Sequence, residues 1–204
     1  TDLSRSFGDR RVLEGVDLHV GSGSVTMLLG QNGSGKTTLL RILAGVLDAD
    51  DGAVSVAGSP PRRGLSAFVP SGDRMLNWRL TGAQNLAFFS RLAGARGREI
   101  DRDLARVASA LDAVALLKRR VGECSMGQRR RLMIAVGFLS AAPVVLLDEP
   151  DADLDDDGRE AVDALCHAWA EGGGVVLFAS PTAASGPASN TVVRLRDGRL
   201  EPSA

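Results

Sequence analysis

The sequence predicts an α/β fold in which a mixed, largely parallel core sheet is joined by an antiparallel β subdomain and a helical insert. Three short and mostly apolar runs, residues 24–29, 144–147 and 175–179, have the character of buried strands. Residues 81–142, by contrast, show helical patterns only. Strands on both sides of an all-helical stretch therefore predict a core sheet with a helical subdomain inserted into it.

Further strands are expected outside the helical stretch, and some of them are antiparallel. A turn at Gly8-Asp9 separates the first two, and Asp197-Gly198, a dipeptide typical of hairpins, separates the last two. The strands of this group are residues 2–7, 12–20, 53–56, 65–69, 192–195 and 199–200. Helices are expected at residues 36–47, 82–92, 100–117, 126–139 and 158–170.

Length and composition favour a single domain with a small net charge. A chain of 204 residues can form one α/β domain, here residues 1–204, and is too short for two. The formal net charge of -1 provides no basic field, so no nucleic-acid partner is expected. The two cysteines have no metal-ligand spacing, which suits a reducing cytosol. Neither a signal peptide nor a run of about 18 apolar residues is present, so any membrane association is expected to be peripheral.

A phosphate-binding loop is predicted directly after the strand at residues 24–29. The pattern is a glycine, four residues, and then Gly-Lys-Thr. The glycines let successive N–H groups point into one concavity, and the following helix adds its positive dipole end. Lys36, one of only two lysines, is expected to reach the β- and γ-phosphates, and the Thr37 hydroxyl to hold Mg²⁺. The predicted nucleotide-binding residues are Gly30, Gln31, Asn32, Gly33, Ser34, Gly35, Lys36, Thr37 and Thr38.

Two carboxylates follow the strand at residues 144–147. Parallel strands present ligand groups at their carboxyl ends, so Asp148 and Glu149 are expected at the same edge as the phosphate loop. Asp148 is expected to hold Mg²⁺ through water, and Glu149 to polarise the water that attacks the γ-phosphate. Many strands end in acids, so this signal becomes strong only in combination with the phosphate loop.

A second anion site is predicted where an arginine-rich helix begins. Ser125 can cap this helix, and Gly127 lets a phosphate approach the backbone. An ordinary N-cap is the alternative that these residues alone favour.

With these three motifs in this order, the chain resembles the nucleotide-binding domain of ATP-binding cassette (ABC) transporters over nearly all of its length. The resemblance implies a P-loop NTPase of the ABC ATPase type that uses ATP and Mg²⁺. Such domains pair head to tail, so each ATP lies between the phosphate loop of one domain and the signature of a second ABC domain. The signature residues here are Ser125, Met126, Gly127 and Gln128, with Met126 in place of a glycine.

The same resemblance implies roles for three residues outside these motifs. Phe7 matches the aromatic residue that stacks on adenine, with Val12 beside the ring, and the alternative for Phe7 is a place in the core. Asp155 matches the aspartate of the D-loop.

The chain also departs from the family pattern at two positions outside the signature. Ser71 stands where the family has glutamine, and Pro181 stands where it has the switch histidine. Proline has no side-chain donor, and serine is too short to reach metal and water as glutamine does. We therefore expect strong MgATP binding and weak hydrolysis at the site built on this phosphate loop. A homodimer would have two slow sites, whereas an unlike partner would supply one active site.

The predicted function is that of an ATP-driven subunit, peripheral on the cytoplasmic face of the cell membrane. It would dock to a membrane-spanning transporter subunit near the Ser71 loop and residues 81–92, where Trp78, Phe88 and Phe89 are candidates for the groove or for the core. Residues 80–86 resemble single-domain exporters of the ABC-2 or haem-exporter type. The alternatives are a soluble ABC ATPase without a membrane partner and a mainly non-hydrolysing regulatory subunit. A phosphate-loop kinase would leave the signature unexplained.

Overall fold

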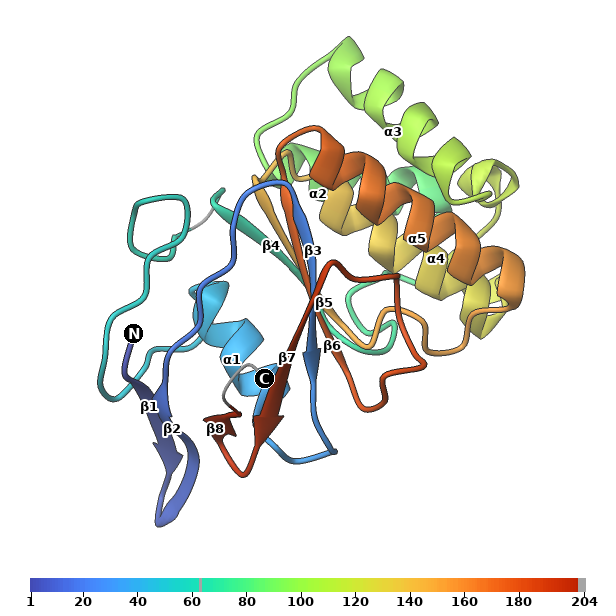
Figure 1. The fold of residues 1–204 in the computed structure, drawn as a ribbon. Helices are drawn as coiled ribbons and strands as arrows, with labels where there is room; N and C mark the ends of the chain where they lie inside the picture. Colours follow the sequence, from blue (N-terminus) through green and yellow to red (C-terminus); the bar gives the residue numbers. More distant parts are fainter. Residues whose placement is uncertain (63, 202–204) are drawn as a thin grey trace.

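A computed structural model describes residues 1–62 and 64–201, and a six-stranded sheet forms its centre (Figure 1). The strand order across the sheet is β4-β5-β6-β3-β7-β8. The first five strands in this order are parallel, and β8 pairs antiparallel with β7. The strands are β3 (Ser24–Leu29), β4 (Ser66–Val69), β5 (Val144–Asp148), β6 (Val175–Ser180), β7 (Thr191–Arg196) and β8 (Arg199–Leu200). The predicted mixed, largely parallel sheet is confirmed.

A separate antiparallel sheet of two strands, β1 (Leu3–Phe7) and β2 (Arg10–Val16), lies beside the central sheet. The predicted extension of the second strand to residue 20 is wrong, because Val16 pairs with Leu3 and β1 has no earlier residue to pair. The predicted strand at residues 53–56 is also wrong. Val56 there bridges back to Ser59 around a tight turn, so the segment pairs with itself.

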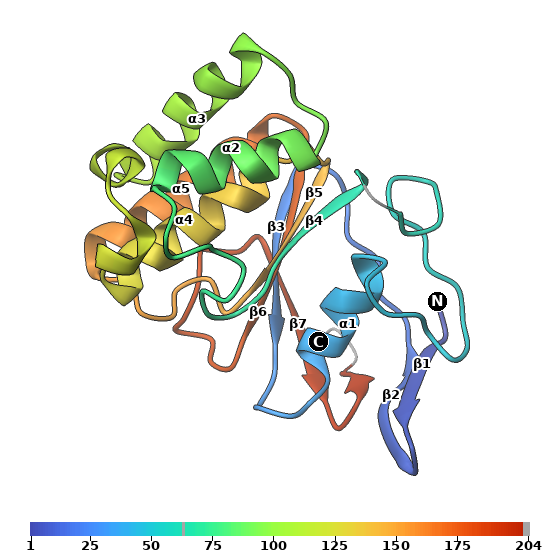
Figure 2. The same cartoon turned by 180° about the vertical axis from the view of Figure 1, so that it is seen from behind.

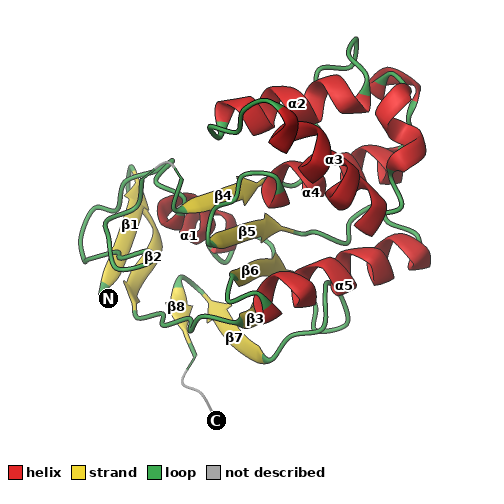
Figure 3. Cartoon of the chain, turned by 90° about the horizontal axis from the view of Figure 1, so that it is seen from above, coloured by secondary structure: helices red, strands yellow, loops and turns green. Residues whose placement is uncertain are grey.

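Helices cover both faces of the central sheet. Helix α1 (Lys36–Leu43) lies on the face nearer β1 and β2, and the four other helices gather on the opposite face (Figures 1 and 2). These are α2 (Gly82–Leu92), α3 (Arg98–Ala110), α4 (Met126–Phe138) and α5 (Asp156–Glu171), with short 3₁₀ helices at Val114–Lys118 and Val121–Glu123. Viewed from above, the sheet separates these two groups (Figure 3). No helix within residues 1–62 and 64–201 has both the length and the apolar character needed to cross a membrane.

Two helices end earlier than predicted, for local reasons. Helix α1 ends at Leu43 rather than at residue 47, because Gly45 adopts a left-handed conformation with φ of 66° and turns the chain away. The helix predicted at residues 100–117 is two pieces. Asp112, with φ of 48°, interrupts it between α3 and the 3₁₀ helix that follows.

Successive side chains along each strand point to opposite faces of the sheet, and this divides the core into two layers. In β3, Val25, Met27 and Leu29 pack with α4 and α5. Leu28 points the other way and packs with α1, β1 and β2. Strands β5 and β6 alternate in the same manner, so both faces of the sheet are buried. This arrangement leaves the carboxyl ends of the strands to form the site.

Candidate nucleotide-binding site

Glycines shape the loop between β3 and α1. Gly33 and Gly35 have φ of 84° and 107°, a region that other residues rarely adopt. A Cβ on Gly35 would lie 2.8 Å from the carbonyl oxygen of Val12. A Cβ on Gly30 would collide with the carbonyl oxygen of Leu195. The loop is therefore held against β2 and β7 as well as bent toward a ligand.

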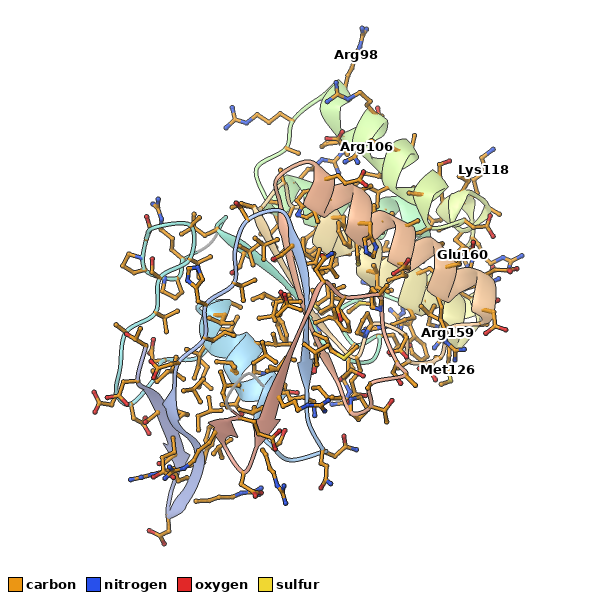
Figure 4. All side chains as sticks on the ribbon, viewed as in Figure 1. Arg98, Arg106, Lys118, Met126, Arg159 and Glu160 are labelled. Carbon is orange, nitrogen blue, oxygen red and sulfur yellow. The ribbon has the colours of Figure 1, made fainter. Side chains whose placement is uncertain are left out.

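Lys36 is held inside this loop rather than extended into solvent. Its side chain is 5% exposed, and its Nζ donates to the carbonyl oxygens of Gly30 and Gln31, the latter at 2.9 Å. Burial lowers the pKa of Lys36, and the negative charges of Glu149 and Asp148 act in the opposite direction. The other lysine, Lys118, extends from the surface of the helical region (Figure 4).

The structure brings the two predicted metal ligands together. The Thr37 hydroxyl donates to the Asp148 carboxylate at 2.9 Å, although the two residues are 111 positions apart. Asp148 is only 3% exposed. A hydroxyl and a carboxylate are oxygen ligands of the kind Mg²⁺ takes together with phosphate oxygens and water, so these residues fit the ion.

A cavity of 410 Å³ joins the predicted nucleotide contacts. The ring of Phe7 is 49% exposed, so this residue does not belong to the core. The Arg5 guanidinium lies 4.9 Å from the centre of that ring. Adenine stacking on Phe7 stays a prediction. The cavity is lined by Phe7, Arg10, Val12, Asn32, Gly33, Gly35, Lys36, Thr37, Thr38 and Glu149.

Glu149 lies just beyond the end of β5, in the wall of this cavity. Its backbone is left-handed, with φ of 50°, and its N–H donates to the carbonyl oxygen of Ala179 at 3.0 Å. A positive φ is uncommon for a residue other than glycine, and such residues concentrate at functional sites.

Comparison with known proteins agrees with this geometry. A family model described as "ABC transporter" matches residues 13–152. The chain belongs to the ABC transporter family. Among its relatives is the cytochrome c biogenesis ATP-binding export protein CcmA of Xanthomonas axonopodis, 37% identical over 93% of this chain and 89% of the relative. Another is the daunorubicin resistance ATP-binding protein DrrA2 of Streptomyces coeruleorubidus, also 37% identical, over 86% of this chain and 56% of the relative.

Solved structures have the same fold. The ATP-binding subunit of an ABC transporter is 25% identical, with a TM-score of 0.89 that covers 100% of this chain and 87% of the other. A dimeric bacterial ABC transporter cassette has a TM-score of 0.88 over 98% of this chain and 95% of the other, at 21% identity. The predicted P-loop NTPase fold of the ABC ATPase type is confirmed. The chain is thus an ATPase of the ABC family with a nucleotide-binding site.

The residues predicted to form the signature, Ser125 to Gln128, lie at the N-terminus of α4. Ser125 accepts a hydrogen bond from the Gln128 N–H at 3.2 Å, and the Gln128 side chain accepts one from the Ser125 N–H at 3.0 Å. Met126 is 61% exposed and points outward (Figure 4). Among the residues that the structure describes, none of these four lines the cavity around the phosphate loop. The N-cap is therefore present, and the contact to a second ATP stays a prediction.

The loop after β5 packs closely against α4. A Cβ on Gly127 would lie 2.6 Å from the carbonyl oxygen of Asp153. Packing within this chain is therefore sufficient to explain a glycine at this position. Asp155 caps α5 by accepting from the Gly158 N–H at 2.9 Å, and Arg131 donates to its carboxylate at 2.6 Å. These hydrogen bonds lower the pKa of Asp155.

Pro181 stands beside the phosphate loop, whereas Ser71 is exposed after β4. Pro181, Thr182 and Ala183 line a second cavity, of 750 Å³, together with residues 29–34. The Thr182 hydroxyl is 2.7 Å from that of Ser185. Pro181 therefore lies in the wall of the cavity beside the phosphate loop, and its side chain has no group that can donate a hydrogen bond to phosphate.

The three aromatic candidates for a docking groove differ in their surroundings. Trp78 is 50% exposed and lines a small hollow with Asp73 and Arg129, whose guanidinium carbon lies 4.2 Å from the Trp78 ring centre. Phe88 is 57% exposed, but Phe89 packs against the core. Only Trp78 and Phe88 therefore remain available to a partner.

Two arginines near the site have no counterpart in the sequence prediction. Arg10 lines both cavities next to the phosphate loop. Arg130 is 2% exposed and donates to four backbone carbonyl groups, two of which belong to Asp148 and Glu149. Arginine pairs and triplets are usually solvated, so the sequence contains no signal that separates Arg130 from its neighbours.

Proposed function

We propose that this chain is the ATP-binding and ATP-hydrolysing subunit that powers a membrane-spanning exporter. In this proposal residues 1–204 form one ABC ATP-binding domain, with a helical subdomain at about residues 81–142. The single observation that carries it is the cavity that joins Lys36 and Thr37 to Glu149, next to Asp148. Export as the direction is supported by the names of two relatives, an export protein and a drug-resistance protein.

Each site residue has a chemical role in this proposal. The loop N–H groups and Lys36 hold the triphosphate, because their positive charge lies where the phosphates enter. Thr37 and Asp148 would hold Mg²⁺, which supplies positive charge to the phosphate oxygens. Glu149 orients a water molecule and accepts its proton as the water oxygen bonds to the γ-phosphorus and the bond to the β-phosphate oxygen breaks.

The proposed site is completed by a second ABC domain, either another copy or an unlike partner. In this arrangement Ser125, Met126, Gly127 and Gln128 of one domain contact the ATP bound to the other. The exposed N-terminus of α4 supports such a contact, since a helix N-terminus attracts phosphate. Asp155 of the D-loop lies close by and would face the same partner.

A membrane-spanning subunit is the second proposed partner, and the chain would sit at the cytoplasmic face of the membrane as a peripheral protein. The rings of Trp78 and Phe88 are exposed, Trp78 lines a hollow with Gly72 and Asp73 of the loop after Ser71, and large exposed apolar side chains mark contact surfaces.

The site built on this chain's own phosphate loop is proposed to bind MgATP well and to hydrolyse it slowly. Pro181 cannot donate to a γ-phosphate, and Ser71 is too short to replace glutamine. Lys36, Asp148 and Glu149 are retained, so slow turnover is expected rather than none.

The steady-state ATPase rate tests this proposal. We expect the isolated protein to bind MgATP and to turn over below about 0.1 s⁻¹, against a typical kcat of about 10 s⁻¹ for enzymes. Assembly with its membrane subunit and an intact partner domain should raise the rate, and Glu149→Gln should abolish the residual activity. Turnover of about 1 s⁻¹ or faster by the isolated protein would contradict the slow site.

Two further outcomes identify the alternatives. An assembled complex that binds ATP without any hydrolysis at this site would indicate a regulatory subunit. Failure to co-purify with any membrane protein would indicate an ABC ATPase that acts without a membrane partner.

A further inference from the structure

Arg130 of α4 is a buried guanidinium whose hydrogen bonds converge on the loop that carries Glu149. Its Nη2 donates to the carbonyl oxygen of Asp148 at 2.6 Å and to that of Glu149 at 2.8 Å. Its Nε donates to the carbonyl oxygen of Pro150 at 3.3 Å. Its Nη1 donates to Pro70, directly before Ser71, at 2.7 Å. The four acceptors are backbone carbonyl oxygens, so Arg130 fixes the backbone conformation of these loops and contacts none of their side chains by these bonds.

These bonds define the backbone on both sides of Glu149. The carbonyl of Asp148 belongs to the peptide plane before the Glu149 Cα, and the carbonyl of Glu149 belongs to the plane after it. One nitrogen holds both planes, so the backbone angles of Glu149 are constrained together. These angles include the left-handed φ of 50°, which a residue other than glycine keeps only when its surroundings require it.

The position of Arg130 makes this constraint rigid. The helix is buried from Arg130 to its end at Phe138, so the guanidinium cannot swing into solvent. Burial lowers the pKa of Arg130 while Asp148 and other acids raise it, and an arginine stays charged even so. A charged, planar group with five donors in a fixed geometry suits several carbonyl groups at once.

We propose that Arg130 is a positioning residue that sets the direction of the Glu149 carboxylate toward the attacking water. This inference rests on the proposed role of Glu149 in ATP hydrolysis. Because the same guanidinium holds Pro70, it also ties the Ser71 loop to the Glu149 loop. Arg130 itself contacts neither nucleotide nor water in this proposal.

Kinetics of Arg130→Met and Arg130→Lys test the proposal. We expect kcat to fall at least about tenfold in Arg130→Met, with KM and the Kd for MgATP changed by less than about twofold, because the phosphate loop is untouched. Arg130→Lys keeps the charge but loses the planar fork, so its loss should be smaller. Leu104→Ala, a core change in α3, serves as the control for destabilisation and should lower the melting temperature without lowering kcat.

Hydrogen exchange separates positioning of the Glu149 loop from general support of the fold, because this readout does not need turnover. The N–H groups of Glu149 and Ala152, which donate to Ala179 and Glu149, should exchange faster in both Arg130 variants and not in Leu104→Ala.

The possible failures are distinguishable. Wild-type protein that does not bind MgATP would overturn the proposed function itself. Wild-type protein that hydrolyses ATP, with Arg130→Met at the same kcat, would overturn only the positioning role. Unchanged exchange in the Glu149 loop of both Arg130 variants would do the same.

Discussion

Individual charged side chains in this molecule are held in place by hydrogen bonds to backbone carbonyl groups. Lys36 is nearly buried, and its ammonium group donates to two carbonyl oxygens of the loop in which it stands. Burial disfavours this positive charge and lowers the pKa of Lys36, and the negative charge of an entering polyphosphate would offset that cost. We therefore expect Lys36 to contribute strongly to ligand affinity.

Lys36→Met is predicted to weaken MgATP binding by about 100-fold, or about 2.7 kcal/mol, because the charge within the phosphate loop is lost. Lys118→Met removes the only other lysine, which is exposed, and is the matched control with unchanged affinity. Calorimetric titration of MgATP measures both variants. Equal affinities for the two would mean that Lys36 does not contact phosphate.

At the scale of elements, α4 connects most of the functional loops. Its first turn contains the predicted signature residues, and the arginines of its second turn hold the loops after β4 and β5. The remaining turns are buried on all sides, between the sheet and the other helices of the same face. An amphipathic pattern is therefore absent from this helix, and only its N-terminus is free to act outside the chain.

Ser125→Ala is predicted to cost about 1 kcal/mol of stability, because it removes the N-cap of α4. Thr81→Ala removes an equivalent capping box from α2 and should cost about the same, a fall of roughly 2–4 °C in melting temperature for each. Only Ser125→Ala should weaken ATP-dependent association of two domains. Sedimentation of the Glu149→Gln background with MgATP measures this, and equal association of the two variants would contradict a signature role.

At the scale of the whole molecule, the parallel sheet assembles a site from distant segments. The Ser71 loop, Glu149, Pro181 and the phosphate loop follow β4, β5, β6 and β3, which are neighbours in that order. Parallel strands end at the same edge, so four segments that are far apart in the chain come together there. Ser71 and Pro181, which differ from the family pattern, therefore follow strands that end at the same edge of the sheet as the phosphate loop.

The combined change Ser71→Gln with Pro181→His is predicted to raise the ATPase rate by about tenfold or more, because it restores groups that reach water and the γ-phosphate. The control Ser71→Gln with Pro181→Ala removes the proline without adding a donor and should give a smaller gain. Steady-state phosphate release compares the two pairs. No gain in the first pair would mean that slow turnover, if observed, has another cause.

The sequence by itself determined the motifs whose chemistry is local. The phosphate loop with Lys36 and Thr37, the strand ending at Asp148, and the N-cap at Ser125 are read from consecutive residues, because turns, caps and buried strands depend on near neighbours. The antiparallel layer and helical stretch were predictable for the same reason. Strand ends at Val16 and helix ends at Leu43 were not, since they depend on pairing and on one glycine.

Only the tertiary structure decided which residues from distant parts of the sequence contact these motifs. Arg129, Arg130 and Arg131 are identical in type and adjacent in sequence, yet they face Trp78, the Glu149 loop and Asp155 respectively. Phe88 and Phe89 likewise divide between surface and core. Successive residues of a helix point in directions about 100° apart, so their roles depend on what the fold places around them.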